Sequence, residues 1–168
     1  MNQTGSGERS TMRTPRDRRH PHRWDEQVYR EQNSPIFLTI CTKGRQRTLV
    51  PDLGDMVVET LRECAERFGM RLHAYCIMPD HLHVVCSVIV GHGRFEEFVK
   101  RFKSDVSRHA HYMGNPDFAW QRSGWDRHAR YEDDVPSRMK YTLDNPVRWG
   151  LCAHWTEWHW SWWERGKC

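Results

Sequence analysis

The sequence has no long hydrophobic run and no closely spaced cysteine pairs. None of its 168 residues lie in an apolar segment approaching the roughly 20 residues that span a bilayer, and the N-terminus lacks the apolar middle of a signal peptide. Cysteines spaced as CxxC are absent. An even number of cysteines permits disulfides, but most lie in apolar segments and are expected to be free, buried thiols. We therefore expect a cytoplasmic protein with no membrane-spanning segment.

Net charge is also lacking outside the N-terminal segment. The formal net charge of +4 equals that of residues 1–23, where six arginines face one glutamate and one aspartate, and the rest of the chain has twenty residues of each sign. A basic tail is typical of proteins that bind polyanions. A solvated terminus without a partner explains the composition equally well. We expect residues 1–27 to form a basic, disordered tail.

What the chain does contain is enough apolar sequence for one folded domain. Apolar residues make up 38% of it, and there are nine tryptophans. Residue type predicts strands, and the spacing of apolar residues predicts helices. The predicted strands are 34–42, 70–78, 81–90 and 125–130, and the predicted helices are 55–69, 95–106 and a third from the acidic residues before Pro136 to near Pro146. This order, β-α-β-β-α-β-α, predicts an α+β fold with a ferredoxin-like antiparallel sheet.

Two histidines lie one residue apart in the third predicted strand. Side chains two apart on a strand share a face, so His81 and His83 point together while Leu82 and Val84 point into the core. Two imidazoles can bind a divalent cation, but a third ligand must come from elsewhere. The chain has eleven histidines and three His-x-His pairs. On this evidence alone, a buried or hydrogen-bonded pair without a metal is therefore the more common interpretation.

The third predicted helix carries candidates for the missing groups. Tyr141 and Asn145 are four residues apart and share a helical face. A helix lying on the sheet beside the histidines would direct the Asn145 amide oxygen to the metal and the Tyr141 hydroxyl next to it. Taken separately, a core tyrosine and a helix-ending asparagine before Pro146 need no functional explanation.

The order of these motifs resembles that of a known family. "MPDHLHVV" (78–85) and "YTLDNPVRWGL" (141–151) are similar to the histidine strand and the catalytic helix of the REP-associated tyrosine transposases, a group of single-tyrosine HUH transposases and nucleases. "RFEEFVKRFKS", "WQRSGWDRHARY" and "HWSWW" match as well, so the resemblance covers about 34–163. It implies an HUH domain over 28–152 with a C-terminal catalytic helix. A Trp-rich C-terminal segment, 153–168, is expected to pack on this domain. The tryptophans 162–163 and the acidic "YEDDV" depart from the family pattern.

The resemblance also implies a chemistry. In such a family Tyr141 attacks a phosphodiester of single-stranded DNA and forms a 5′-phosphotyrosine, while His81, His83 and Asn145 hold Mg²⁺ or Mn²⁺. The phosphotyrosine ester conserves the bond energy, so rejoining needs no ATP, and the chain indeed lacks a P-loop. The implied partner is single-stranded DNA with a hairpin, bound by a monomer or homodimer.

Other residues are weaker candidates for contact with DNA. Lys100 and Arg108 lie opposite the apolar stripe of the second predicted helix, Lys103 lies on the same helix, and Arg148 lies in the catalytic motif. His128, on the last predicted strand, is a candidate assisting group, although lone histidines are usually structural. The six tryptophans between 149 and 163 are expected to pack on the sheet more than to stack on bases.

Three alternative functions remain open from the sequence. A replication initiator or relaxase would use the same chemistry, but such proteins are usually larger. A domesticated, sequence-specific DNA-binding protein would keep the fold without strand transfer. A structural metal-binding domain would leave Tyr141 without a role.

Overall fold

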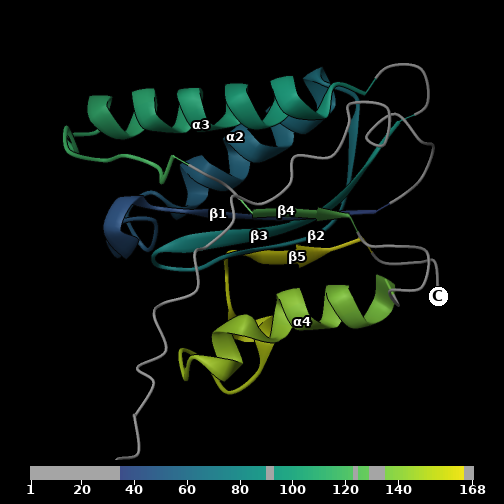
Figure 1. The fold of residues 1–168 in the computed structure, drawn as a ribbon. Helices are drawn as coiled ribbons and strands as arrows, with labels where there is room; N and C mark the ends of the chain where they lie inside the picture. The colour runs from purple at the N-terminus through teal and green to yellow at the C-terminus, as the bar shows by residue number, and fades with distance from the viewer. Residues whose placement is uncertain (1–34, 90–92, 123–124, 129–134, 165–168) are drawn as a thin grey trace, which may run out of the picture.

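The computed structural model describes residues 35–89, 93–122, 125–128 and 135–164, which form an antiparallel sheet between two layers of helices (Figure 1). The five strands have the order β4-β1-β3-β2-β5. They are β1 (Ile36–Cys41), β2 (Met70–Ile77), β3 (His81–Val88), β4 (Trp125–His128) and β5 (Ser161–Trp163). β3 lies between β1 and β2 and is antiparallel to both. This is the split β-α-β arrangement, so the predicted α+β, ferredoxin-like fold is confirmed.

The helices are divided between the two faces of the sheet. α2 (Gly54–Arg67) and α3 (Phe95–Tyr112) cover one face, and α4 (Val135–Arg148) lies on the other (Figure 1). Two short 3-10 helices, η1 (Lys43–Arg45) and η2 (Trp155–Glu157), follow β1 and α4. Among the described residues, no helix is both long and apolar enough to cross a membrane.

The central strand β3 is buried along its whole length and separates two environments. Because side chains alternate along a strand, Leu82 and Val84 pack into the main core beneath α2 and α3. Val85, which has the same parity as His81 and His83, packs instead in a small cluster that includes Met139 of α4. The expectation that the two histidines point away from the main core is therefore confirmed.

Helix α4 passes through Pro146 and ends at Arg148, close to the predicted end near Pro146. A proline inside a helix removes the N–H that would bond the carbonyl four residues earlier, here that of Thr142. The side chain of Asn145 takes over this role: its Nδ2 donates to the Thr142 carbonyl at 3.3 Å and to the Tyr141 carbonyl at 2.8 Å. A side-chain donor thus replaces the missing backbone donor, and the helix continues for two residues.

The end of α4 is a Schellman motif. Gly150 has a φ of 66°, in the left-handed region, which glycine adopts without steric cost. Its N–H donates to the Val147 carbonyl at 2.9 Å, and that of Leu151 donates to the Pro146 carbonyl at 2.9 Å. The chain then turns back toward the sheet.

The Trp-rich segment contacts the domain by extending the sheet, which the sequence did not predict. β5 pairs with β2, with Trp162 opposite Tyr75, and the rings of these two residues stack at 5.7 Å. The indole N–H of Trp158 donates to the Ile77 carbonyl at 2.9 Å, and that of Trp160 to Asp55 Oδ1 at 2.9 Å. The segment therefore covers the edge of β2.

The described cysteines are free thiols, as expected. Cys41, Cys64, Cys76 and Cys86 are buried, and Cys152 is half-buried. Cys168 and the predicted basic tail (1–27) lie outside the described residues.

Candidate functional site

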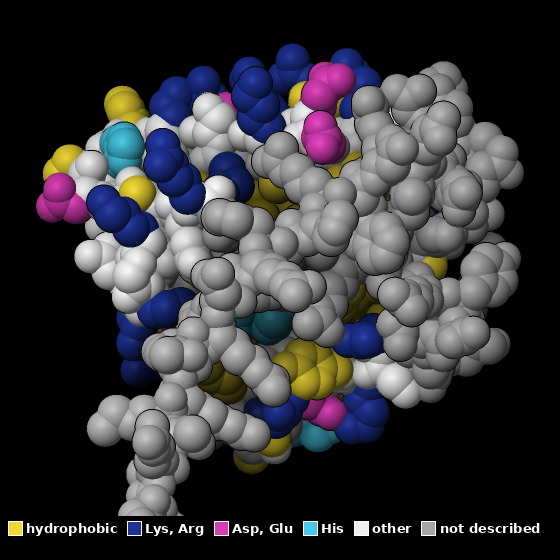
Figure 2. Space-filling model, viewed as in Figure 1, with side chains coloured by type: hydrophobic (Ala, Val, Ile, Leu, Met, Phe, Trp, Pro, Cys, Tyr) yellow, Lys and Arg dark blue, Asp and Glu magenta, His cyan; other side chains and the backbone are white. Residues whose placement is uncertain are grey.

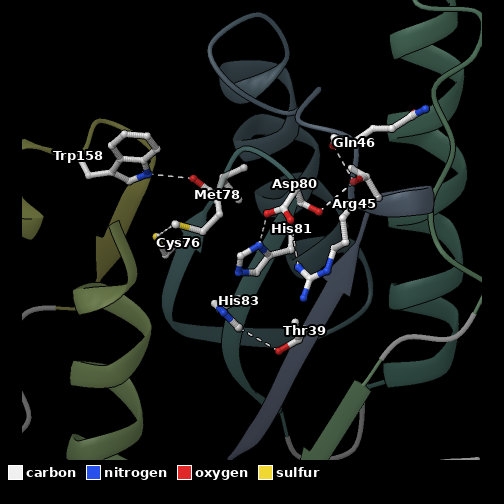
Figure 3. A network of polar contacts seen from close by, with 11 residues as sticks. Thr39, Arg45, Gln46, Cys76, Met78, Asp80, His81, His83 and Trp158 are labelled. Atoms are coloured by element: carbon white, nitrogen blue, oxygen red, sulfur yellow. Dashed lines mark hydrogen bonds and ion pairs between the residues drawn. The ribbon is translucent and has the colours of Figure 1, made fainter. Parts of the chain in front are cut away.

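The histidine pair forms the centre of the site on the α4 side of the sheet. His81 and His83 are 4% and 7% exposed, and their ring centroids are 4.8 Å apart with nearly perpendicular planes. His81 Nδ1 lies 2.5 Å from Asp80 Oδ1, and His83 Nδ1 lies 2.9 Å from Thr39 Oγ1 (Figure 3). Within the described part of the chain, neither Nε2 atom has a hydrogen-bond partner. Each ring is thus oriented by one nitrogen and leaves the other available to a ligand.

The turn between β2 and β3 fixes the position of Asp80. Its backbone carbonyl accepts hydrogen bonds from the N–H and the hydroxyl of Thr42, at 3.0 and 2.9 Å. Its buried carboxylate bonds His81 through one oxygen and Arg45 Nη1 through the other, at 3.3 Å. A carboxylate accepts rather than donates, so His81 carries its proton on Nδ1 and its lone pair on Nε2.

Burial keeps both histidines neutral at neutral pH. It lowers the pKa of His83 to about 3, and the neighbouring His81 and Arg45 act in the same direction. Burial also lowers the pKa of His81, although the hydrogen bond that His81 donates to Asp80 opposes this shift. A neutral imidazole is the form that binds a metal ion.

Helix α4 and the residue directly after it present three residues, four positions apart, to the histidine pair. The Tyr141 ring lies 6.1 Å from the His83 ring, and the Trp149 ring lies 5.7 Å from the His81 ring. Asn145 lies one turn from each on the same helical face and is buried. Since its two neighbours along this face each contact one histidine, Asn145 lies opposite the pair.

The amide of Asn145 is oriented by the helix itself. Both hydrogen bonds from Nδ2 go to carbonyl groups of α4. Among the described residues, Oδ1 has no hydrogen-bond partner. Two Nε2 atoms and one amide oxygen therefore remain available as metal ligands. This set fits a divalent cation and leaves further coordination positions for other oxygen ligands. Among the described residues, no three His, Cys, Asp or Glu side chains are arranged so that they could hold a metal ion together, so a metal site here depends on this amide.

The ring of Tyr141 is held by its neighbours while part of the residue stays exposed. Phe37 contacts it edge-on at 6.3 Å, and the Arg148 guanidinium lies 4.7 Å above its ring centroid, a cation–π distance. Tyr141 is 43% exposed. The phenol is thus oriented beside the histidines and accessible to a substrate.

The predicted DNA contacts are divided between two layers. Arg148 lies at the site, whereas Lys100, Lys103 and Arg108 belong to α3, on the opposite layer, where basic side chains gather (Figure 2). Lys103 Nζ donates to the Gln121 carbonyl at 2.8 Å. The structure does not bring these three residues to the histidine pair. Contact of any of the four with DNA stays a prediction, as does a role for His128, whose side chain lies outside the described residues.

Four residues of the site were not predicted from the sequence: Thr39, Arg45, Asp80 and Trp149. Thr39 is the cross-strand partner of His83, and only strand register shows this. Asp80 directly precedes His81, so a possible carboxylate–histidine pair was visible in the sequence. Arg45 lies in a short basic loop with no periodic pattern.

The fold and this arrangement of a tyrosine-bearing helix opposite a histidine pair define a single-tyrosine transposase class. The chain belongs to the family of IS200-like transposases, whose family model ("Transposase IS200 like") matches residues 32–131. The matched range includes the histidine pair, and α4 follows it.

Individual relatives agree with this assignment. The REP-associated tyrosine transposase of Escherichia coli (strain K12) is 21% identical over 125 residues, which cover 74% of this chain and 73% of the relative. The ISDra2 transposase TnpA of Deinococcus radiodurans is 31% identical over 68 residues, covering 40% and 48%. A solved structure of a REP-associated tyrosine transposase bound to a REP hairpin superposes with a TM-score of 0.67 at 20% identity, covering 79% of this chain and 78% of that one. The expected resemblance is confirmed.

Proposed function

We propose that this transposase cleaves and rejoins single-stranded DNA that carries a hairpin, through a covalent link to Tyr141. The observation that carries the proposal is the line of Tyr141 and Asn145 on α4 and Trp149 directly after it, in which the Tyr141 ring lies beside His83 and the Trp149 ring beside His81. The preference for a hairpin is supported by the solved structure of similar fold, a REP-associated tyrosine transposase bound to a REP hairpin.

The covalent step uses the phenol of Tyr141 as the nucleophile. Its oxygen attacks the phosphorus of a phosphodiester, the bond between phosphorus and the 3′ oxygen breaks, and the phenol proton is released while the 3′ oxygen gains one from solvent. The products are a 5′-phosphotyrosine and a free 3′-hydroxyl. A second 3′-hydroxyl reverses the step on another strand, so no external energy source is needed.

The surrounding residues hold the groups that this reaction requires. His81, His83 and Asn145 would hold Mg²⁺ or Mn²⁺, which polarises a phosphate and stabilises the charge that develops on it. Asp80 and Thr39 orient the two imidazoles, and the Nδ2 bonds of Asn145 direct its oxygen away from the helix. Arg148 and Phe37 hold the phenol ring in place.

A test uses the denaturation-resistant adduct that this mechanism leaves. The protein is incubated with Mg²⁺ and labelled single strands carrying the hairpins that flank its own gene, and the products are separated under denaturing conditions. The wild type should form a labelled protein band, and Tyr141→Phe, which loses one oxygen and little packing, should form none. Tyr112→Phe is the matched control, because Tyr112 is 93% exposed at the end of α3 and should leave the adduct unchanged.

Two outcomes would contradict the mechanism. An adduct formed by the Tyr141→Phe variant would place the nucleophile elsewhere. Tight binding of the hairpin by the wild type with no adduct and no cleavage would instead favour a domesticated DNA-binding protein of the same fold.

A further inference from the structure

The loop after β1 places a single arginine beside the histidine pair. Asp80 bonds His81 Nδ1 through Oδ1 and Arg45 Nη1 through Oδ2. The imidazole and the guanidinium are therefore held by the two oxygens of one carboxylate, and Figure 3 shows both groups on the same side of the sheet, with His83 nearby. Arg45 thus belongs to the site although it lies far from the histidine pair in sequence.

The backbone of this loop is held in an uncommon conformation. Gly44 and Arg45 have φ values of 64° and 58°, and for arginine the left-handed region costs about 1 kcal/mol or more. Hydrogen bonds keep the loop closed: Arg45 N–H donates to the Thr42 carbonyl at 3.1 Å, and the Thr42 hydroxyl donates to the Gln46 carbonyl at 2.7 Å. The direction in which the Arg45 side chain leaves the loop is therefore fixed.

The guanidinium has more donors than its partner uses. Of its five N–H donors, one makes a contact of 3.3 Å with Asp80, and the others have no hydrogen-bond partner among the described residues. The side chain is 54% exposed. A half-exposed guanidinium with unused donors beside a nucleic-acid cleavage site has the geometry of a phosphate ligand, because it can present two parallel N–H groups to two phosphate oxygens.

We propose that Arg45 forms a phosphate subsite of the candidate site, where it binds a backbone phosphate of the single strand lying across His81 and His83. The proposal rests on the proposed function, since it takes the substrate to be single-stranded DNA. The alternative is a structural role, in which Arg45 only holds the Asp80 carboxylate in position for His81.

The two roles predict opposite results in two binding measurements. Both are made in a Tyr141→Phe background, so that no cleavage interferes. Binding of a short fluorescein-labelled thymidylate strand is followed by anisotropy over a range of potassium chloride concentrations, and binding of Mn²⁺ alone is followed by calorimetry. For a phosphate contact, Arg45→Ala should weaken DNA binding several-fold and reduce the slope of log affinity against log salt by about 0.7, because one fewer counterion is released. Its Mn²⁺ affinity should not fall, because removing a positive charge beside the histidine pair does not weaken the binding of a cation there.

Two further variants complete the design. Arg45→Lys keeps one positive charge and should restore the salt slope while binding DNA less tightly than arginine, since it lacks the planar fork. Arg94→Ala is the matched control: Arg94 pairs with Glu97 at 2.9 Å, its side chain is 56% exposed, and it directly precedes α3 on the other layer. This variant should leave the affinity for the thymidylate strand and its salt slope unchanged.

The outcomes separate this proposal from the proposed function. An Arg45→Ala variant with an unchanged salt slope and weakened Mn²⁺ binding would show that the arginine is structural and overturn the subsite. If thymidylate binding depends on Arg45 but the wild type forms no adduct with hairpin DNA, the strand-transfer mechanism fails and the subsite stands. If the protein does not bind single strands at all, both proposals are wrong.

Discussion

On one face of the sheet, α2 and α3 cover an apolar core in which Phe98 and Phe102 are fully buried. On the other face, α4 covers a small apolar cluster of Phe37, Ala74 and Val85, beside which His81, His83 and Asn145 are buried polar residues. Burying a polar group is costly unless it is hydrogen-bonded, and the site residues meet this condition while leaving one atom of each histidine unused. The comparison shows how one strand, β3, can stabilise the fold through one face and serve chemistry through the other.

The largest expected effect lies on the polar face. Replacing His81 or His83 by alanine should lower the rate of adduct formation at least about 1000-fold, because it removes one of three candidate metal ligands. Adding EDTA to the wild type should have the same effect. Gel-based cleavage rates with and without added Mg²⁺ measure this. Undiminished cleavage in EDTA would show that the polar face does not act through a metal.

A substitution on the apolar face should instead lower stability strongly and the cleavage rate little. Phe98→Ala, in the main core, should reduce the free energy of unfolding by about 3–5 kcal/mol, since it creates a cavity among fully buried side chains. Urea unfolding followed by circular dichroism measures this. At a temperature where the variant stays folded, its cleavage rate should remain close to that of the wild type. A rate as low as that of the histidine variants would mean that the two faces are not functionally separate.

The polar face should also make stability depend on pH. The pKa of His83 is lowered from 6.5 to about 3, so the unfolded chain binds a proton below pH 6.5 that the folded protein does not. Stability contributed by neutral His83 is therefore complete above pH 6.5 and is lost as the pH falls toward 3. From pH 7 to 5 the loss is about 2 kcal/mol. Unfolding by urea in the presence of EDTA, at both pH values, measures it.

His83→Gln is the control for this prediction, because glutamine does not titrate. The variant should be less stable than the wild type at pH 7 but should lose less stability between pH 7 and 5. The stability of the variant should still depend partly on pH, since burial also lowers the pKa of His73 and His81. Equal losses in the two proteins would contradict the assignment to His83.

The apolar face was the more predictable from sequence, for a physical reason. Its pattern is local: the alternation along β3 and the helical stripe of α3 depend only on neighbouring residues. The site depends on long-range pairing, such as Thr39 opposite His83, which strand register sets and sequence does not show. The three-residue strand β5 was missed because its pairing with β2, not its own pattern, makes it a strand.

The smallest expected effect concerns Asn145, which both stabilises helix α4 and is a candidate metal ligand. Proline at 146 leaves the Thr142 carbonyl without a backbone donor, and the Asn145 amide supplies one. Asn145→Ala should therefore cost about 1 kcal/mol of stability, and it should lower cleavage less than a histidine variant does, because water can occupy a vacated oxygen position. Asn145→Asp keeps an oxygen for the metal but loses the donor, so it should keep more of the cleavage activity while losing stability.

A double-mutant cycle with Pro146→Ala isolates the helix contribution. Alanine at 146 restores the backbone N–H that can donate to the Thr142 carbonyl, so in this background the amide of Asn145 is no longer needed there. The stability cost of Asn145→Ala should fall by about half or more when position 146 is alanine, a coupling that chemical unfolding of the four proteins can measure. Its effect on cleavage should be the same in both backgrounds, because the Oδ1 atom is lost in each. If the stability cost is instead independent of position 146, the amide does not substitute for the proline's missing donor, and the passage of α4 through Pro146 has another cause.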